Sequence, residues 1–303
     1  MTAHAIVGAT LADGSPVDVV IDGERIEAVG PGAGAGLPGR VEARAGLLLP
    51  AYVDTHVHLD KVLVRDQLAE HDGTLQAAIE AGRAAKRVYD VEDVRRRARA
   101  VIESSVLTGT TRLRSHVDVD TIGGLVPLEG VVAAAHDCAD IAEVQVVAFP
   151  QEGILRDPGT ADLMAAAMTA GAAVVGGMPH WETTEDDQRE HVRVCFELAR
   201  RFDADVDMHV DETDDGTVRT LAMVVDETER TGWQGRVTVG HVCALAAADD
   251  AYAERVIAGC VRAGITVVSN PVTNLVLQGR GDRGLVRRGT TRVRELMTAG
   301  VPV

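Results

Sequence analysis

The amino-acid sequence predicts an α/β fold, a (β/α)8 TIM barrel that follows a small N-terminal β-sandwich part. Three observations support this prediction. From residue 47 onward, short apolar runs alternate with helical patterns, and seven of these runs have the length of strands. Residues 1–49 instead alternate apolar runs with turn sequences. The chain has 303 residues, 46% of them hydrophobic, which is enough to bury a large core.

The N-terminal domain is expected to cover residues 1–49, and the barrel domain residues 50–303. Turn sequences such as Ala12–Ser15 and Asp22–Glu24 separate the apolar runs of the first domain. These runs do not have helical spacing, so we expect a β-rich unit that forms part of a sandwich.

The barrel begins with the apolar run Leu47–Val53, which predicts a buried strand leading to two histidines. The predicted strands are Leu47–His58, Thr111–Val119, Val144–Phe149, Ala173–Gly177, Val206–Val210, Val237–Gly240 and Thr266–Ser269. Helices are predicted between them, for example over Val91–Thr108, Asp186–Phe202 and Asp249–Arg262. Because helical crossovers join successive strands, the sheet should be parallel. An eighth strand would begin at Val301–Val303, so we expect it to be truncated.

Composition and charge narrow the classes of partner. The formal net charge of −16 disfavours a surface for nucleic acid or for an anionic membrane, so the partner should be a small molecule or another copy of the chain. A long uncharged stretch, Leu163–Met178, contains three glycines and is better explained as a helix end, a turn and a strand than as a membrane span. The four cysteines form no C-x-x-C pair, and the N-terminus lacks the pattern of a signal peptide. We therefore expect a cytoplasmic protein with reduced cysteines.

Two histidines one residue apart, His56 and His58, end the first predicted barrel strand. Residues i and i+2 of a strand point to the same face, so both imidazoles should project together. Two further predicted strands carry histidines near their ends, His209 and His241. Since the active site of such a barrel lies at the carboxyl ends of its strands, these side chains should converge.

Three neutral imidazoles, those of His56, His58 and His209, can bind one divalent metal ion together with a fourth, anionic ligand. A metal ion held in this way lowers the pKa of a bound water to about 7 and so supplies a nucleophile near neutral pH. Glu212, three residues after His209, could then transfer protons between this nucleophile and a substrate. The alternative for Glu212 is a solvated loop carboxylate in the acidic run 211–215. His241 could form a hydrogen bond with the nucleophile.

Gln151 follows the third predicted strand and has an amide with one acceptor and two donors. Such a group suits recognition of the edge of a heterocyclic base. A capping or loop amide explains it equally well.

Several longer segments resemble the amidohydrolase superfamily, and its cytosine deaminase branch in particular. The resemblance covers essentially all of the chain and is carried by Pro50–Asp60, Ser115–Val119, Val147–Leu155, His209–Asp215 and Asn270–Arg280. It implies one iron or zinc ion on His56, His58 and His209, with Glu212 as proton shuttle. It also implies His241 beside the nucleophile, Gln151 on the pyrimidine edge, and a homo-oligomer.

The sequence departs from this family pattern in three places. The family's metal-binding aspartate at the end of strand eight would lie beyond Val303. Lys61 stands where the cytosine enzymes carry threonine, which is more like relatives acting on other nitrogen heterocycles or substituted triazines, although an ordinary loop lysine would also explain it. The fourth predicted strand has no lysine that could become a bridging carbamate, which argues against a two-metal site.

Together these observations predict a metal-dependent aminohydrolase that deaminates cytosine or a similar amino-substituted heterocycle, with Fe2+ or Zn2+ as cofactor. One alternative is hydrolysis of another C–N bond in a ring compound, such as an N-alkylamino triazine, a pterin or a cyclic amidine. The other is a truncated relative without catalytic activity. A zinc deaminase of the kind that edits nucleic acids is excluded, because His180 and Glu182 form an H-x-E but no P-C-x-x-C accompanies it.

Overall fold

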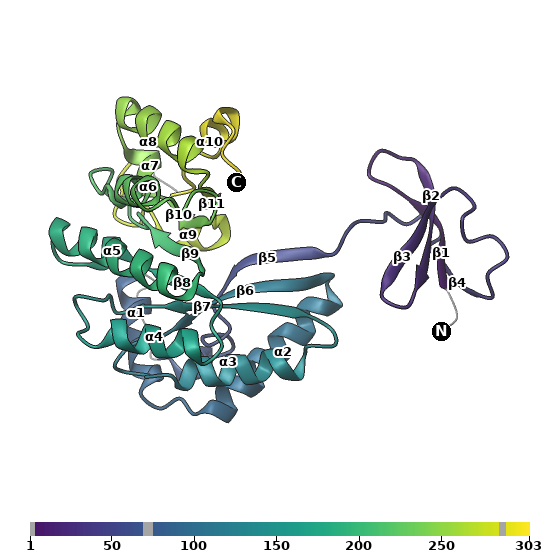
Figure 1. Ribbon diagram of the computed structural model, residues 1–303, viewed down its shortest axis with the longest axis horizontal. Coiled ribbons are helices and arrows are strands. Elements are labelled where there is room, and N and C mark those ends of the chain that lie inside the picture. Colours follow the sequence, from purple (N-terminus) through teal and green to yellow (C-terminus); the bar gives the residue numbers. More distant parts are fainter. Residues whose placement is uncertain (1–3, 69–74, 285–288) are drawn as a thin grey trace. The chain divides into compact units, whose positions relative to one another are not determined.

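The computed structural model describes residues 4–68, 75–284 and 289–303 (Figure 1). The chain divides into two compact units, residues 1–52 and residues 53–303. None of the described helices is both long enough and apolar enough to cross a lipid bilayer.

The first unit is a four-stranded sheet with the strand order β3-β2-β1-β4. Its strands are β1 (His4–Thr10), β2 (Pro16–Asp22), β3 (Arg25–Gly30) and β4 (Gly39–Glu42). The pairs β1–β2 and β2–β3 are antiparallel, while β4 runs parallel to β1. Alternation along the strands buries Ala5, Val7 and Val20 in one small cluster and Ala9, Val17 and Val19 in another. This sheet is the β-rich part that the turn sequences predict.

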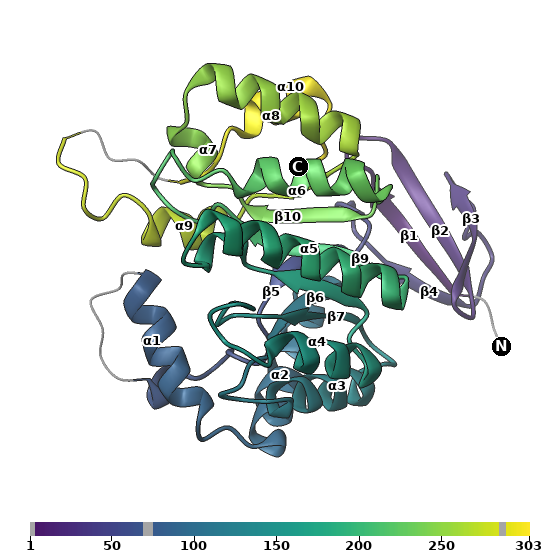
Figure 2. The ribbon, with the colours of Figure 1, turned by 60° about the vertical axis from the view of Figure 1, so that its left-hand side comes forward.

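The second unit contains seven parallel strands in the order in which they follow along the chain, with helices between them. The strands are β5 (Tyr52–Val57), β6 (Thr110–Asp118), β7 (Glu143–Phe149), β8 (Val174–Gly177), β9 (Asp205–Val210), β10 (Val237–His241) and β11 (Thr266–Val268). Figure 2 shows several helices along the outer face of this sheet, with α2 and α3 against β6, α4 against β7 and α5 against β8. The predicted α/β barrel is therefore confirmed.

The helices are α1 (Leu75–Lys86), α2 (Val91–Leu107), α3 (Val126–Asp137), α4 (Thr160–Thr169), α5 (Glu185–Phe202), α6 (Thr220–Thr231), α7 (Ala244–Ala247), α8 (Asp250–Ala263), α9 (Pro271–Leu277) and α10 (Val293–Ala299). Two short 3-10 helices cover Arg65–Gln67 and Pro179–Trp181. Side-chain caps fix several starts: Asp90 accepts from the Asp93 amide, Thr184 forms a capping box with Asp187, and Asp249 caps α8. These caps explain why the three predicted helices begin within one residue of their expected positions.

The prediction of a buried strand from Leu47 onward is wrong. The strand β5 begins only at Tyr52, and Leu47 is 62% exposed. Leu47 makes a single β-bridge with Thr10 of the first unit, and Pro50, which has no N–H for a sheet ladder, follows shortly after it. Apolar composition alone did not distinguish this connection from a buried strand.

The last described residues lie beside β11. The amide of Val267 donates to the carbonyl of Pro302 at 2.9 Å, while Val301 is buried. Val301–Val303 therefore occupy the position in which the sequence predicts the start of an eighth strand.

Candidate metal centre and proton-transfer site

The four predicted histidines converge at the carboxyl ends of the barrel strands. His56 lies in β5 and His58 directly after it, while His209 lies in β9 and His241 ends β10. The ring centroid of His56 is 4.6 Å from that of His209 and 4.9 Å from that of His241. Parallel strands with their carboxyl ends on one rim bring together residues that are 185 positions apart, as His56 and His241 are.

Gly240 makes room for this arrangement. A Cβ atom at position 240 would lie 3.2 Å from Cε1 and 3.3 Å from Nδ1 of the His56 ring. These distances are tighter than ordinary van der Waals contact, so a larger residue would push the ring of His56 away from its neighbours.

His56, His58 and His209 fit the geometry of a metal site. Each offers one ring nitrogen, and these three atoms lie within 4.8 Å of one another. The Nε2 atoms of His58 and His209 are 3.2 Å apart. Two nitrogens bound tetrahedrally to one zinc ion would lie roughly 3.3 Å apart. The nitrogens of His58 and His209 thus have the spacing of two ligands of a single ion, and the nitrogen of His56 lies within 4.8 Å of both.

The protonation state of these imidazoles also suits metal binding. Burial lowers the pKa of His56, His58 and His209 well below the ordinary value of 6.5. The cost of placing a second positive charge beside a neighbouring ring lowers all three further, and Lys61 adds to this for His56 and His58. The rings are therefore neutral near pH 7, the state in which histidine binds a metal ion.

Glu212 and His241 face each other beside the histidine cluster. The Nδ1 atom of His241 is 3.1 Å from Oε1 of Glu212, and both side chains are buried. Asp211 fixes the loop that carries Glu212, since its carboxylate accepts from the Thr220 amide at 2.9 Å at the start of α6. Both Asp211 and His241 have positive φ angles, 52° and 69°, which is costly for residues other than glycine and typical of functional sites.

A third buried group connects Glu212 and His241. Asn274 of α9 donates through Nδ2 to Oε1 of Glu212 at 3.1 Å. Its Oδ1 atom lies 3.0 Å from Nδ1 of His241. Sequence reasoning gave Asn274 no role, because it lies 33 residues from His241 without any periodic relation to it.

Gln151 lies at the other side of the pocket with its amide orientation fixed. Lys61 donates to Oε1 of Gln151 at 2.6 Å and pairs with Asp118 at 2.7 Å. Because an ammonium group can only donate, the oxygen of Gln151 must face Lys61. The Nε2 atom of Gln151 then points toward Met178, 3.4 Å from its sulfur. Lys61, which the sequence left open between a loop residue and a site residue, thus lies in the site.

A buried network of charged side chains is joined to Lys61 through Asp118. Lys86 of α1 pairs with Asp118 at 2.7 Å, with Asp120, and with Glu152 at 3.3 Å. Burial by itself would lower the pKa of Lys86, but attraction to Asp118 and Asp120 outweighs burial and raises it. Lys86 is therefore charged in the interior and holds together the segments that follow β6 and β7.

These groups line one cavity of about 330 Å3, large enough for a small heterocycle. Its lining residues are His56, Val57, His58, Ile79, Gln151, Met178, His209, Glu212, His241, Thr273 and Leu277. All six site residues singled out in the sequence are among them. An adjoining cavity of about 170 Å3 shares Ile79 and Gln151 with it and is also lined by Lys61 and Lys86.

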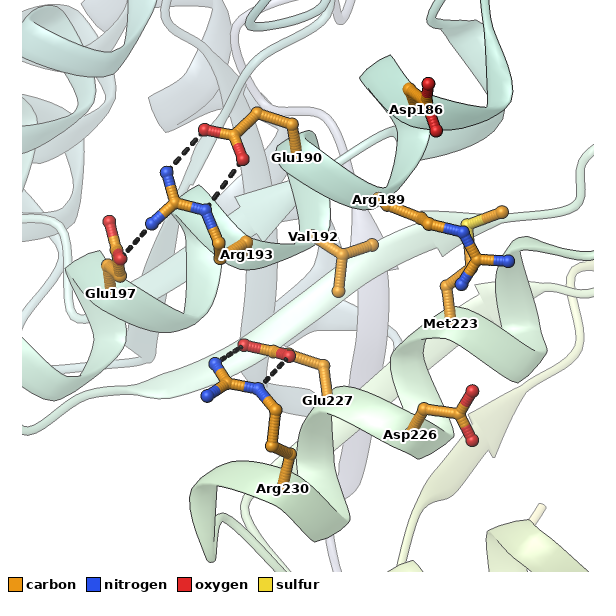
Figure 3. A pocket seen from close by; sticks show the side chains of 10 residues that line it. All are labelled: Asp186, Arg189, Glu190, Val192, Arg193, Glu197, Met223, Asp226, Glu227 and Arg230. Atoms are coloured by element: carbon orange, nitrogen blue, oxygen red, sulfur yellow. Dashed lines mark hydrogen bonds and ion pairs between the residues drawn. The ribbon is translucent and has the colours of Figure 1, made fainter.

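A larger groove of about 470 Å3 lies elsewhere, between the outer helices α5 and α6 (Figure 3). Several of its charged side chains pair with one another: Arg193 with Glu190 and Glu197, and Arg230 with Glu227. The groove contains no histidine. It therefore offers none of the chemistry found at the rim of the barrel.

Comparison with known proteins agrees with the geometry. A model of the amidohydrolase family matches residues 64–303. A curated pterin deaminase of Rhizobium rhizogenes (strain K84 / ATCC BAA-868) is 31% identical over 94% of this chain and 65% of its own length. The N-isopropylammelide isopropyl amidohydrolase of Pseudomonas sp. (strain ADP) is 29% identical over 80% of this chain and 61% of its own. This chain thus spans less than two thirds of the length of these two relatives.

Solved structures are similar over nearly the whole chain. The 5-methylcytosine deaminase of Klebsiella pneumoniae with bound 5-fluorocytosine has a TM-score of 0.93 and 34% identity, over 98% of this chain and 73% of that one. The N-isopropylammelide isopropylaminohydrolase of Burkholderia multivorans has a TM-score of 0.83 and 29% identity, over 99% and 73%. The expected resemblance to the amidohydrolases and to their cytosine deaminase branch is confirmed.

Proposed function

The chain belongs to the amidohydrolase family, and from this premise we propose that it carries the site of a metal-dependent aminohydrolase. The proposed substrate is cytosine or a similar amino-substituted nitrogen heterocycle, from which ammonia is released. One observation supports this proposal most directly. The three neutral imidazoles of His56, His58 and His209 share one small cavity with a buried carboxylate and a fixed amide.

His56, His58 and His209 would hold one divalent ion, Fe2+ or Zn2+. When bound, such an ion supplies an activated water as nucleophile near neutral pH. The carboxylate of Glu212 lies in the same cavity and is the group placed to move protons. It takes a proton from the nucleophile and delivers it to the ring nitrogen beside the amino-bearing carbon. The remaining water proton passes to the amino group, which leaves as ammonia.

Gln151 and Lys61 indicate which edge the substrate presents. The oxygen of Gln151 accepts from Lys61 and one N–H of its amide faces the Met178 sulfur, so the amide has a second N–H donor for the cavity. A substrate that fits must present an acceptor there, such as a ring carbonyl oxygen. Cytosine and related oxo-substituted rings carry this group next to the ring nitrogen that is protonated.

A second candidate function is hydrolysis of another C–N bond in a ring compound. The adjoining cavity of about 170 Å3 favours it, because that space could hold a larger ring or a ring substituent. Pterin and N-isopropylammelide, named for two of the relatives, are compounds of these two kinds.

A substrate panel tests the proposal. The zinc-loaded and iron-loaded chains are assayed with cytosine, 5-methylcytosine, pterin and N-isopropylammelide, and the products are scored separately as ammonia and alkylamine. Ammonia from a cytosine supports the main proposal, and alkylamine or pterin turnover supports the second candidate. A chain that binds neither metal and turns over none of the four would support the relative without catalytic activity.

Glu212→Gln separates proton transfer from metal binding. The amide cannot take up or release the proton, so we expect turnover to fall at least about 10²-fold while metal content stays unchanged. Glu24→Gln, an exposed glutamate in the first unit, is the matched control and should behave like the wild type. Normal turnover of Glu212→Gln would refute the assignment of Glu212.

The same proposal includes a cytoplasmic location and a homo-oligomer that acts on a small molecule. The four cysteines are free and buried, as expected of a protein in a reducing compartment. Light scattering of the purified chain would test the oligomeric state.

A further inference from the structure

The cavity of about 170 Å3 beside the candidate active site takes no part in the proposed proton transfer. It shares Ile79 and Gln151 with the larger cavity, so the two spaces adjoin at these side chains. The helix α1 lines it through Ile79, Gly82 and Arg83, and Lys61 lines it as well. A substituent on a ring bound in the larger cavity could therefore extend past Gln151 into this space.

Two cationic side chains bring unused hydrogen-bond donors to the smaller cavity. The ammonium group of Lys61 has three N–H bonds, and Oε1 of Gln151 and the carboxylate of Asp118 accept two of them. Arg83 donates to Glu152 through Nε at 2.9 Å and through Nη2, while its Nη1 has no partner among the described residues. Both cationic side chains are partly exposed, so water can satisfy these donors until an acceptor on a ligand replaces it.

The charges around this cavity are already balanced. The network consists of three cations and three carboxylates, namely Lys61, Arg83 and Lys86 with Asp118, Asp120 and Glu152. An anionic group that approached Nζ of Lys61 would also approach Asp118, whose buried carboxylate lies 2.7 Å from that atom. Repulsion between the two anions would offset much of the attraction to Lys61. A neutral acceptor meets no such repulsion.

We propose that the smaller cavity is a second subsite of the active site, which binds a neutral, acceptor-bearing part of the substrate through Lys61 and Arg83. This inference rests on the proposed function for the ring that the larger cavity holds. It adds what that ring carries, which is an uncharged substituent with an acceptor atom and not a carboxylate. Lys61 and Arg83 are then specificity-determining residues.

Derivatives of uracil, the product of cytosine deamination, test the subsite without any need for turnover. Acetyl, carboxylate and isopropyl groups at ring position 5 or 6 are similar in size, but only the acetyl group is a neutral acceptor. Isothermal titration calorimetry of the full chain at pH 7, with zinc added, gives the dissociation constants. We expect one acetyl isomer to bind at least about 10-fold more tightly than uracil and than the isopropyl derivative at the same position, as a hydrogen bond to a charged donor allows. The carboxylate derivatives should bind no more tightly than uracil.

This series of ligands decides the inference by itself. If neither acetyl isomer binds more tightly than uracil, or if none of the ligands binds, the subsite is refuted. A carboxylate derivative that binds more tightly than both acetyl isomers would overturn the preference for a neutral group. An isopropyl derivative that binds as tightly as the acetyl derivative would overturn the role of the two cationic side chains.

Filling the cavity from α1 shows where the acetyl group binds. Gly82 has an ordinary helical backbone, and a Cβ atom at this position would meet nothing within 4 Å. The side chain of Gly82→Leu should therefore occupy the cavity and abolish the difference in affinity between the acetyl derivative and uracil. Ala84→Leu, at an exposed position of the same helix, is the matched control and should keep this difference.

A second variant removes one donor without filling the space. Arg83→Met lacks the Nη1 donor, while Lys86 still pairs with Glu152. The difference in affinity between the acetyl derivative and uracil should become smaller. Arg87→Met, at an exposed position just after α1, is the control. A difference that stayed unchanged in both Gly82→Leu and Arg83→Met would refute the location of the subsite.

The substrate panel separates this inference from the proposed function. If the acetyl group raises affinity as expected but no substrate is turned over, the proposed function fails while the subsite stands. If a cytosine is deaminated but the acetyl group adds no affinity, the subsite fails while the proposed function stands.

Discussion

At the scale of single residues, the candidate metal site depends on Gly240, which has no side chain, as well as on the three histidines. The ring of His56 lies so close to residue 240 that a Cβ atom there would be only 3.2 Å from its Cε1 atom. The next residue, His241, has a φ angle of 69°, so β10 ends in a sharp change of direction that turns its imidazole into the cavity. Gly240, which lets the His56 ring approach, and His241, which has a strained backbone, are therefore neighbours in the chain at the point where the histidines converge.

Gly240→Ala should weaken metal binding although residue 240 is not a ligand. The added methyl group lies 3.2 Å from Cε1 of His56 and forces that ring to move. We expect zinc affinity to fall roughly 10- to 100-fold, as is usual when the support of a ligand is disturbed. A competition titration against a chelating dye measures it. Gly30→Ala, where a Cβ would meet nothing within 4 Å, is the control, and equal zinc affinity of the two variants would contradict the argument.

At the scale of elements, a buried pair ties the substrate-facing loops to α5. The carboxylate of Glu182 accepts from the amide of Ile154 at 2.6 Å, in the loop after β7 that carries Gln151. His191 of α5 contacts Glu182 through Nδ1 at 2.7 Å, and its Nε2 accepts from the amide of Met178 at 2.9 Å. Gln151 and Met178 are thus positioned by one hydrogen-bonded unit outside the cavity.

This unit should make the stability of the chain depend on pH. Burial lowers the pKa of His191 below 6.5 and outweighs the attraction of Glu182, so the folded state keeps the ring neutral. The unfolded chain binds a proton there at about pH 6.5. As the pH falls below this value the unfolded state binds more protons, and the free energy of unfolding decreases.

Urea unfolding between pH 7.5 and pH 5.5 measures this effect. The wild type should lose stability on acidification more steeply than His191→Phe, which cannot titrate at this position. Other buried histidines contribute to the slope of both proteins, so only the difference between the two slopes belongs to His191. Parallel slopes would contradict the expected role of His191.

The sequence predicted well those elements that show a short hydrophobic period or whose ends are marked by a capping or turn residue. The barrel strands, the capped helices and the histidines at strand ends all belong to this class, and they lie where they were expected. The strand predicted from Leu47 failed, because hydrophobicity does not reveal whether a partner strand lies opposite. Asn274 and the network of Lys86 with Asp118 and Glu152 could not be predicted, because their contacts join segments with no shared pattern.

At the scale of the whole molecule, the candidate metal site joins distant parts of the barrel. His58 follows the first strand of the sheet and His209 lies in the fifth, 151 residues later. Glu212 and Asn274 extend the site to α9. A metal ion at this site would therefore connect segments that only the folded barrel brings together, and it would bind the folded state in preference to the unfolded chain.

Zinc should accordingly raise the thermal stability of residues 53–303. At a free zinc concentration of 100 times the dissociation constant, the expected gain is about 2.7 kcal/mol. Both tryptophans, Trp181 and Trp233, lie in this unit, so their fluorescence follows its unfolding. The rise in Tm should disappear when a chelator is added and should be absent in His209→Ala. His136→Ala, at an exposed position at the end of α3, should keep it. If zinc left the Tm of the wild type unchanged, or raised that of His209→Ala equally, the three histidines would not be the site at which the ion binds the folded chain.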